Sequence, residues 1–218
     1  GGFCGDVISQ VLRKASFSVT SEYYINDAGG QIEKLGHSVL KDEAACYSGE
    51  YIDELNKKYG QMQDVWEVGK LAAEEVLENI IKKTVRENMH IEYEVWTSEQ
   101  KIQDDGYVDR AIEVLKEKGL TYESEGALWL KTTQFGDDKD RVLIKNDGKK
   151  AYFAGDCGYM LNKLERGFDR LIMGLGADHH GYIGRLKALA QALGFSGDFR
   201  FIISPLVRVV KDGKEARM

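Results

Sequence analysis

Strand-like and helix-like patterns alternate between residues 151 and 203, and this alternation constrains the fold more than any other feature. Segments 151–154, 170–175 and 199–203 are predicted strands, and segments 159–166 and 182–193 are predicted helices. Neighbouring parallel strands need a crossover connection, which is usually a helix. The pattern therefore predicts an α/β protein with a parallel sheet, in which ligands bind at the carboxyl ends of the strands.

The segment before residue 98 mixes helices and strands in the same way. Apolar residues at helical spacing between Asp64 and Glu87 predict a long helix with Asp64 as its N-cap. Residues 91–96 alternate between apolar and polar side chains, which predicts a strand. The remaining expected elements are helices at 6–14, 31–40 and 51–58 and a strand at 18–25 that ends in an Asn-Asp-Ala-Gly-Gly turn.

Residues 98–150 show a different pattern of predicted secondary structure, with short β-like segments and many turns. We expect a helical segment that opens at Ser98, a helix at 107–118 that is closed by Gly119, and an Asp147-Gly148 hairpin turn. Short strands are predicted at 120–123, 128–132 and 141–145. The chain thus divides into a first α/β part at 1–97, an α+β insertion at 98–150 and a second α/β part at 151–218.

Composition excludes several classes of protein. The 218 residues include 24 Gly and 1 Pro, and 43% are hydrophobic, which fits a folded globule and excludes a proline-rich linker. No run of about 18 apolar residues suggests a membrane span. The N-terminal sequence has no basic and apolar stretches of a secretion signal. Three scattered cysteines without zinc-type spacing predict a reduced, cytoplasmic chain.

The charge is uneven along the chain. The net charge is −6 overall, but residues 161–218 carry 10 basic and 6 acidic side chains, so that this end is net +4. The acidic balance of the rest argues against a simple nucleic-acid coat. The basic end is where an anionic ligand is expected to bind.

The stretch Gly-Leu-Gly-Ala-Asp-His-His-Gly at 174–181 follows a predicted strand and precedes a predicted helix. Its glycines would let a ligand approach the backbone, and Asp178 could accept hydrogen bonds from a ribose diol. Two alternatives stay open. Asp178 could simply cap the helix, or the Asp-His-His run could bind manganese as in a family of phosphoesterases, although His37 and His90 do not supply that family's other ligands.

Acidic residues also follow other predicted strands. Glu99 and Asp156 stand at two strand exits, with Tyr152 beside the second. Carboxylates that converge on one pocket suit a cation such as a guanidinium, whose forked donors match them in pairs. The alternative is that these are ordinary surface acids in a chain with 36 of them. No phosphate-binding loop, nucleophile elbow or zinc-protease motif occurs, so residue patterns alone support an α/β protein with a pocket.

Several longer strings together resemble the catalytic domain of bacterial arginyl-tRNA synthetases, in the order of that family. The first is Glu-Tyr-Tyr-Ile-Asn-Asp-Ala-Gly at 22–29. Two strings resemble the family's connective insertion, namely Gly-Ala-Leu-Trp-Leu-Lys-Thr-Thr at 126–133 and Phe-Gly-Asp-Asp-Lys-Asp-Arg at 135–141. The strings at 151–156, 165–169 and 176–182 resemble the second half of its nucleotide-binding fold.

This resemblance implies a class I aminoacyl-tRNA synthetase with a Rossmann-type parallel sheet, interrupted by a connective insertion at 98–150. Such an enzyme uses ATP, accompanied by Mg²⁺, to convert L-arginine to arginyl-adenylate. It then transfers the arginyl group to the terminal adenosine of tRNA(Arg), and activation usually requires bound tRNA. The resemblance further implies a cytoplasmic monomer.

The resemblance also implies roles for single residues. Glu99 and Asp156 would hold the guanidinium of arginine, Tyr152 would wall the side-chain pocket, and His179 would make a second polar contact. Gly176 and Asp178 would face the ribose of ATP.

The sequence departs from the family pattern in two ways. Neither the HxGH signature nor a complete Lys-Met-Ser-Lys-type loop is found in the chain, so we expect a catalytic-core fragment that is inactive alone. Residues 157–160 read Cys-Gly-Tyr-Met, where the family more often has Ile-Ala-Tyr-His. The alternatives are a non-catalytic synthetase-like binding module, the manganese phosphoesterase, or a cysteinyl synthetase, whose zinc-binding cysteines this chain does not supply.

Overall fold

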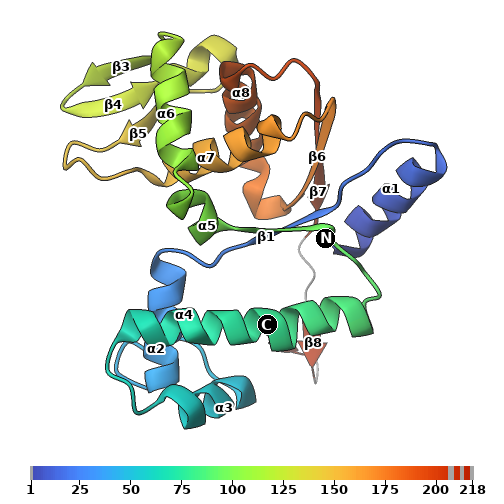
Figure 1. The fold of residues 1–218 in the computed structure, drawn as a ribbon, viewed down its shortest axis with the longest axis vertical. Helices are drawn as coiled ribbons and strands as arrows, with labels where there is room; N and C mark the ends of the chain where they lie inside the picture. Colours follow the sequence, from blue (N-terminus) through green and yellow to red (C-terminus); the bar gives the residue numbers. More distant parts are fainter. Residues whose placement is uncertain (1, 206–208, 212–213, 217–218) are drawn as a thin grey trace. The chain divides into compact units, whose positions relative to one another are not determined.

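The computed structural model describes residues 2–205, 209–211 and 214–216 (Figure 1). Side chains are described in this range except those of 178–180, 209–211 and 214–216. The chain divides into two compact units, which we call the N-terminal unit (Gly2–Lys101) and the C-terminal unit (Ile102–Met218). Each unit contains one pair of parallel strands, and the two units are described separately.

The N-terminal unit pairs its two strands in parallel, β1 (Glu22–Ile25) and β2 (Val95–Ser98). The register sets Glu22 opposite Val95 and Ile25 opposite Ser98, so that both strands end at the same level. Between them the chain forms helices, and one more helix precedes β1. These are α1 (Gly2–Lys14), α2 (Gly30–Leu40), α3 (Glu50–Tyr59), α4 (Val65–Val76) and the π-helical turns η1 (Leu77–Lys82) and η2 (Thr84–Asn88).

Glycine allows the closest packing in this unit, where α2 contacts α4. A methyl group added at Gly36 would lie 2.0 Å from the Val65 carbonyl oxygen, and one at Gly69 would lie 2.2 Å from the Ile32 carbonyl oxygen. Both distances are too short for any side chain. The buried residues of this core come from α2, α3 and α4. They are Val39, Ile52, Leu55, Val68 and Ala72.

The predicted cap of the long helix is confirmed. The Asp64 carboxylate accepts hydrogen bonds from the backbone N–H groups of Trp66 and Glu67, at 2.9 and 3.1 Å. The helical path continues to Asn88 as predicted, but from Leu77 onward it is π-helical. The predicted strands of this unit are shorter than expected, and β2 begins four residues later than the alternating pattern indicated.

The C-terminal unit combines helices with three sheets in its described residues (Figure 1). The helix α5 (Glu99–Asp104) runs across the boundary between the units. The larger antiparallel sheet has the order β3–β4–β5, β6 pairs with β7 in parallel, and β8 pairs with β9 antiparallel. The elements are α6 (Tyr107–Glu117), β3 (Thr121–Ser124), β4 (Ala127–Leu130), η3 (Thr132–Phe135), β5 (Arg141–Ile144), α7 (Tyr152–Glu165), β6 (Arg170–Gly176), η4 (Ala177–Tyr182), α8 (Ile183–Leu193), β7 (Asp198–Ser204), β8 (Val209–Lys211) and β9 (Lys214–Ala216).

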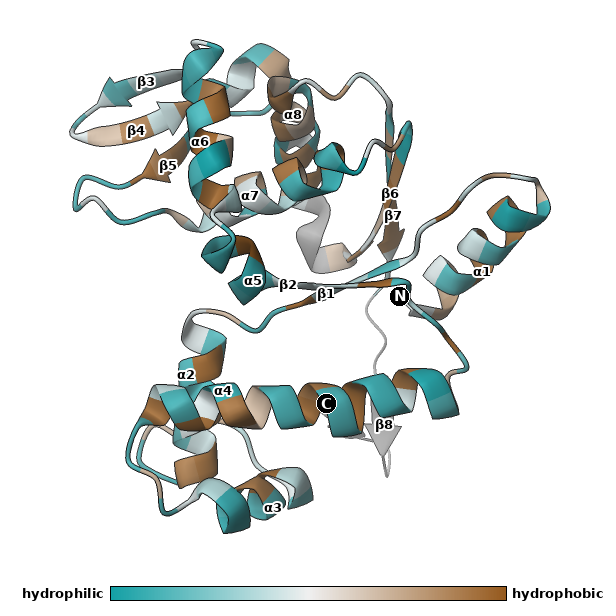
Figure 2. Ribbon diagram, viewed as in Figure 1, coloured by the Kyte–Doolittle hydropathy of each residue, from teal (hydrophilic) through white to brown (hydrophobic). Residues whose placement is uncertain are grey.

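One core joins α6, α7 and α8 with the antiparallel sheet. Gly158 of α7 lies so close to α6 that an added methyl group would be 2.8 Å from a Val108 methyl and 2.9 Å from its backbone nitrogen. Figure 2 shows α8 coloured as hydrophobic along most of its length. In agreement, six of its residues are buried, namely Leu186, Ala188, Leu189, Ala190, Ala192 and Leu193.

One sequence prediction for this unit is wrong. Residues 151–154 are not a strand, because α7 begins at Tyr152 and continues through the helix predicted at 159–166. The buried positions Phe153, Ala154, Cys157, Met160 and Leu161 recur at helical spacing and pack one face of α7 into the core. This packing overrides the strand propensity of Tyr152 and Phe153.

Other predictions for this unit are confirmed. The parallel pairing of β6 with β7 extends over seven residues, from Arg170 opposite Asp198 to Gly176 opposite Ser204. The Asp147-Gly148 turn closes with a hydrogen bond from Gly148 N–H to the Lys145 carbonyl at 2.9 Å.

Two further findings concern both units. The three cysteines, Cys4, Cys46 and Cys157, are free thiols. None of the helices in the described ranges is long and apolar enough to cross a lipid bilayer.

Candidate functional site

The carboxyl ends of β1 and β2 bring polar residues of two distant segments together. Because Ile25 and Ser98 are in register, the residues that follow them, Asn26-Asp27 and Glu99-Gln100, leave the sheet side by side. The backbone N–H of Gln100 donates a hydrogen bond to Asp27 Oδ1 at 3.0 Å. The turn after β1 is thereby tied to the first turn of α5.

Glu99 is partly buried at the start of α5. Burial raises the pKa of Glu99 above its usual value of 4.5, and the nearby Asp27 carboxylate adds to the rise, whereas a hydrogen bond with Tyr24 opposes it. Two carboxylates at one partly buried place disfavour each other's charge. A bound cation would relieve this repulsion, so the carboxyl ends of β1 and β2 are suited to a positively charged ligand.

Sequence reasoning predicted Glu99 but missed Tyr24 and Asp27 as its partners. The residue pattern predicts only a turn at Asp27. The signal that could have found it is its position, since Asp27 lies two residues after the end of β1 and Glu99 lies one residue after the end of β2. Side chains at the carboxyl ends of adjacent parallel strands meet at one edge of the sheet.

Tyr152 and Asp156 lie on the first two turns of α7 instead of at a strand end. They are four residues apart and therefore share one face of the helix. Tyr152 is 76% exposed, and Asp156 is partly buried. The adjacent Cys157 is fully buried, and burial followed by the charge of Asp156 raises the pKa of its thiol. Tyr152 and Asp156 thus offer an accessible ring and a carboxylate on the same surface.

Gly176 ends β6 and opens the predicted glycine-rich turn. The turn continues as η4 and leads directly into α8, so the expected passage from strand to helix is confirmed. The side chains of Asp178 and His179 lie outside the described residues, and their predicted roles stay untested.

The predicted site residues fall in both units. Glu99, with Tyr24 and Asp27, belongs to the N-terminal unit, whereas Tyr152, Asp156 and Gly176 belong to the C-terminal unit. Within the side chains that the structure describes, no group of three or more His, Cys, Asp or Glu could hold a metal ion. Met160, where the family more often has histidine, is 1% exposed in the core.

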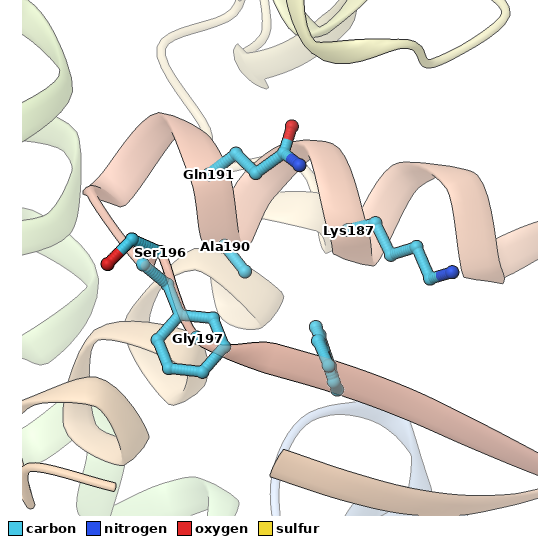
Figure 3. A pocket seen from close by; sticks show the side chains of 7 residues that line it. Lys187, Ala190, Gln191, Ser196 and Gly197 are labelled. Carbon is cyan, nitrogen blue, oxygen red and sulfur yellow. The ribbon is translucent and has the colours of Figure 1, made fainter. Parts of the chain in front are cut away.

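A surface cavity of about 220 Å³ lies elsewhere on the C-terminal unit (Figure 3). Lys187 and Gln191 of α8 line it together with Phe195 and Phe199. Gly197, which immediately precedes β7, also lines it, so the cavity lies at the amino end of that strand. Ligands of parallel sheets bind at the carboxyl ends, and none of the predicted site residues lines this cavity.

Comparison with known proteins relates the chain to one family throughout its length. The family model for the catalytic domain of class I tRNA synthetases (R) matches residues 49–216. Arginine–tRNA ligases from Bacillus subtilis and Bacillus velezensis are 39% and 38% identical to the whole chain. The chain spans 43% of the length of each of these relatives.

Solved structures agree with this relation. The crystal structure of an arginyl-tRNA synthetase from Campylobacter jejuni covers the whole chain with a TM-score of 0.87 and 34% identity, and the chain covers 52% of that structure. An arginyl-tRNA synthetase from Plasmodium falciparum matches 94% of the chain with a TM-score of 0.68 at 15% identity, which shows likeness of fold alone. The structural likeness confirms the predicted α/β fold of Rossmann type.

Proposed function

Because the chain belongs to the family of class I arginyl-tRNA synthetases, we propose that it forms part of the catalytic core of an arginine–tRNA ligase. The reaction joins the carboxylate of L-arginine to the α-phosphate of ATP and releases pyrophosphate. The arginyl group then passes to the terminal adenosine of tRNA(Arg), and AMP leaves. The observation that carries the proposal is the identity of 38–39% with arginine–tRNA ligases over the whole chain. The carboxylates of Glu99 and Asp27 at the carboxyl ends of β1 and β2 add a site that suits a cation.

We assign four residues to the recognition of arginine, as the resemblance to the family implies. Glu99 and Asp156 would each accept hydrogen bonds from the forked donors, Tyr152 would cover the aliphatic part of the side chain, and His179 would add a polar contact. Paired carboxylates match a planar guanidinium better than a single ammonium group. Citrulline would leave buried carboxylates uncompensated, and such polar mismatches discriminate by about 10⁴-fold.

The turn that starts at Gly176 is assigned to ATP. It lies at the carboxyl ends of β6 and β7, where nucleotides bind in folds of this type. Gly176 would let the nucleotide approach the backbone, and Asp178 would accept hydrogen bonds from the ribose. Mg²⁺ would enter with the triphosphate of ATP, and no residue of this chain is assigned to hold it.

We also propose a cellular compartment and an oligomeric state. Three free thiols, of which two are exposed, fit a reducing compartment, and we assign the protein to the cytoplasm as a monomer. The division into 1–97, 98–150 and 151–218 belongs to the same proposal, with 98–150 as the connective insertion between the two halves of the core.

Isotope exchange between ATP and pyrophosphate tests the proposal, in the whole protein that carries this sequence and with tRNA(Arg) present. We expect exchange that depends on arginine and not on lysine or citrulline. Asp156→Ala should raise the KM for arginine on the order of 100-fold, because a buried carboxylate partner of a cation is lost, and should leave the KM for ATP within about threefold.

The matched control is Asp109→Asn, which changes an exposed carboxylate paired with Lys150 in the same unit. It should leave both KM values unchanged. Exchange that depends on another amino acid would reject arginine as the substrate. An equal rise of both KM values in Asp156→Ala would reject the assignment of Asp156 to the guanidinium.

A further inference from the structure

A buried ion pair in the C-terminal unit has no part in the assignments above. Arg141, the first residue of β5, donates two hydrogen bonds to Asp137, from Nε to Oδ2 at 2.7 Å and from Nη2 to Oδ1 at 2.8 Å. The side chains are 10% and 4% exposed. Arg141 also pairs with the exposed carboxylate of Asp138. The two parallel bonds fix the planes of both groups as well as their distance.

Such a pair is not by itself a source of stability. Removing two charges from water costs free energy that their attraction only partly returns. Well-packed apolar residues at the same positions often give an equal free energy of unfolding. The two parallel hydrogen bonds between Asp137 and Arg141 instead suit a structural role, in which the pair holds a neighbouring element in one position. The neighbouring element is α8, because η3, which ends two residues before Asp137, packs against it.

The carboxylate of Asp137 lies at the first turn of α8. A methyl group added at Gly184, the second residue of that helix, would be 3.9 Å from Asp137 Oδ1. The N-cap residue Tyr182 makes no side-chain capping hydrogen bond. A negative charge beside the first turn stabilises a helix by interacting with the positive end of its dipole. Asp137, in the loop between η3 and β5, is therefore placed to stabilise this end of α8.

Tyr182 lies close to one guanidinium and within the electrostatic influence of a second. The guanidinium of Arg185 lies over its ring at 4.3 Å from the centroid, and the same guanidinium is 5.7 Å from the centroid of Phe153. Hydrogen bonding to Asp137 raises the pKa of Arg141 against the effect of burial, and the nearby Tyr182 adds to the rise. The end of η4 and the start of α8 therefore share one electrostatic environment with the buried pair.

We propose that Asp137 and Arg141 are positioning residues, which hold the first turn of α8 and thereby the shape of the turn from Gly176 to Tyr182. Neither residue needs to touch a substrate. The consequence for ATP rests on the proposed function, in which this turn faces the nucleotide. The link between the ion pair and the turn does not depend on that function and can be measured without turnover.

Amide hydrogen exchange of the full chain tests this link. Asp137→Asn keeps the shape of the side chain and removes its charge. We expect the amides of η4 and of the first turn of α8 to exchange about tenfold faster, relative to those of α6 and β4 in the same unit. Arg141→Lys, which keeps the charge but not the two parallel bonds, should give the same local pattern with a smaller amplitude. The control Asp109→Asn, which removes a charge from the first turn of α6, should leave the exchange of η4 and of the first turn of α8 unchanged.

The exchange pattern distinguishes a local effect on η4 and α8 from a general loss of stability of the C-terminal unit. Equal acceleration in η4, α6 and β4, or no acceleration, would overturn it. Both variants keep a polar side chain at the site, and Arg141→Lys provides the test if Asp137→Asn does not fold.

A kinetic measurement in the whole protein then addresses ATP. Asp137→Asn should raise the KM for ATP about tenfold and leave the KM for arginine within about twofold. Local acceleration of exchange without a change in the KM for ATP would keep the link to the turn and reject the assignment of that turn to ATP. An unchanged exchange pattern would reject the link even if the protein is an active arginine–tRNA ligase.

Discussion

Glu99 in the N-terminal unit is partly buried and Asp137 in the C-terminal unit is almost fully buried, but their surroundings shift their pKa values in opposite directions. Burial and the neighbouring Asp27 raise the pKa of Glu99. Burial would also raise the pKa of Asp137, yet hydrogen bonds from Arg141 and from the Asp138 backbone lower it to about 2.

The difference lies in what already compensates the negative charge. Asp137 has a guanidinium from its own chain, held by two parallel hydrogen bonds. Glu99 has the hydroxyl of Tyr24 and a second carboxylate nearby. Asp137 therefore has its counter-charge within the chain, whereas a cation bound next to Glu99 would favour its charged form. By this comparison, Arg141 does for Asp137 what the arginine ligand is proposed to do for Glu99.

The largest expected effect comes from removing the internal cation. Arg141→Met should lower the free energy of unfolding of the C-terminal unit by about 3–5 kcal/mol, because it leaves the carboxylate of Asp137 buried without a counter-charge. Urea unfolding, followed through NMR signals of that unit, measures the loss. Arg110→Met is the control, since its pair with Glu165 is exposed and should contribute at most about 1 kcal/mol. Similar losses in both variants would show that Asp137 and Arg141 behave as an ordinary surface pair.

The second effect concerns Glu99, the carboxylate that we propose binds the guanidinium of arginine. Glu99→Gln should raise the KM for arginine on the order of 100-fold in the whole protein, because the guanidinium loses a charged partner. Stability should rise or stay the same, since burial disfavours the charge of Glu99 in the absence of ligand. Steady-state exchange kinetics and thermal unfolding measure the two quantities. Glu92→Gln removes an exposed charge from the same segment and should alter neither. A loss of stability in Glu99→Gln would place Glu99 with the structural carboxylates.

The smallest effect appears in acid. The pKa of Asp137 is about 2 in the folded chain and 3.8 as a reference for the unfolded chain. A lowered folded pKa means that the stabilisation is fully present above about pH 4 and is lost as the pH falls through 2. This difference corresponds to about 2 kcal/mol.

Unfolding free energies measured between pH 5 and pH 2 provide the test. Asp137→Asn should show a shallower decrease than the unaltered chain, and the difference between the two curves isolates Asp137 from other acids with lowered pKa values, such as Asp140. Parallel curves would contradict the lowered pKa and remove the contrast with Glu99.

Much of the fold could be predicted because it depends on neighbours in sequence. The Asp64 cap, the helices at 31–40, 51–58, 107–118 and 182–193, and the Asp147-Gly148 turn follow from residue types within one or two turns of chain. The passage from β6 through the glycine turn to α8 was predictable for the same reason. The one wrong element, the strand at 151–154, is where local propensity and tertiary packing disagree, since Phe153 and Ala154 are buried as part of a helix.

The sequence by itself determined most of the α/β alternation, the glycine-rich turn and the acidic Glu99 after a strand, because these are properties of short segments. Only the tertiary structure decided that Asp156 lies on a helix and which acids share a charge environment. Asp27 meets the backbone of Gln100 across 73 residues, and Asp137 reaches the first turn of α8 from a separate element. Burial and electrostatic interaction depend on distance in space, so the contrast between Glu99 and Asp137 exists only after the chain has folded.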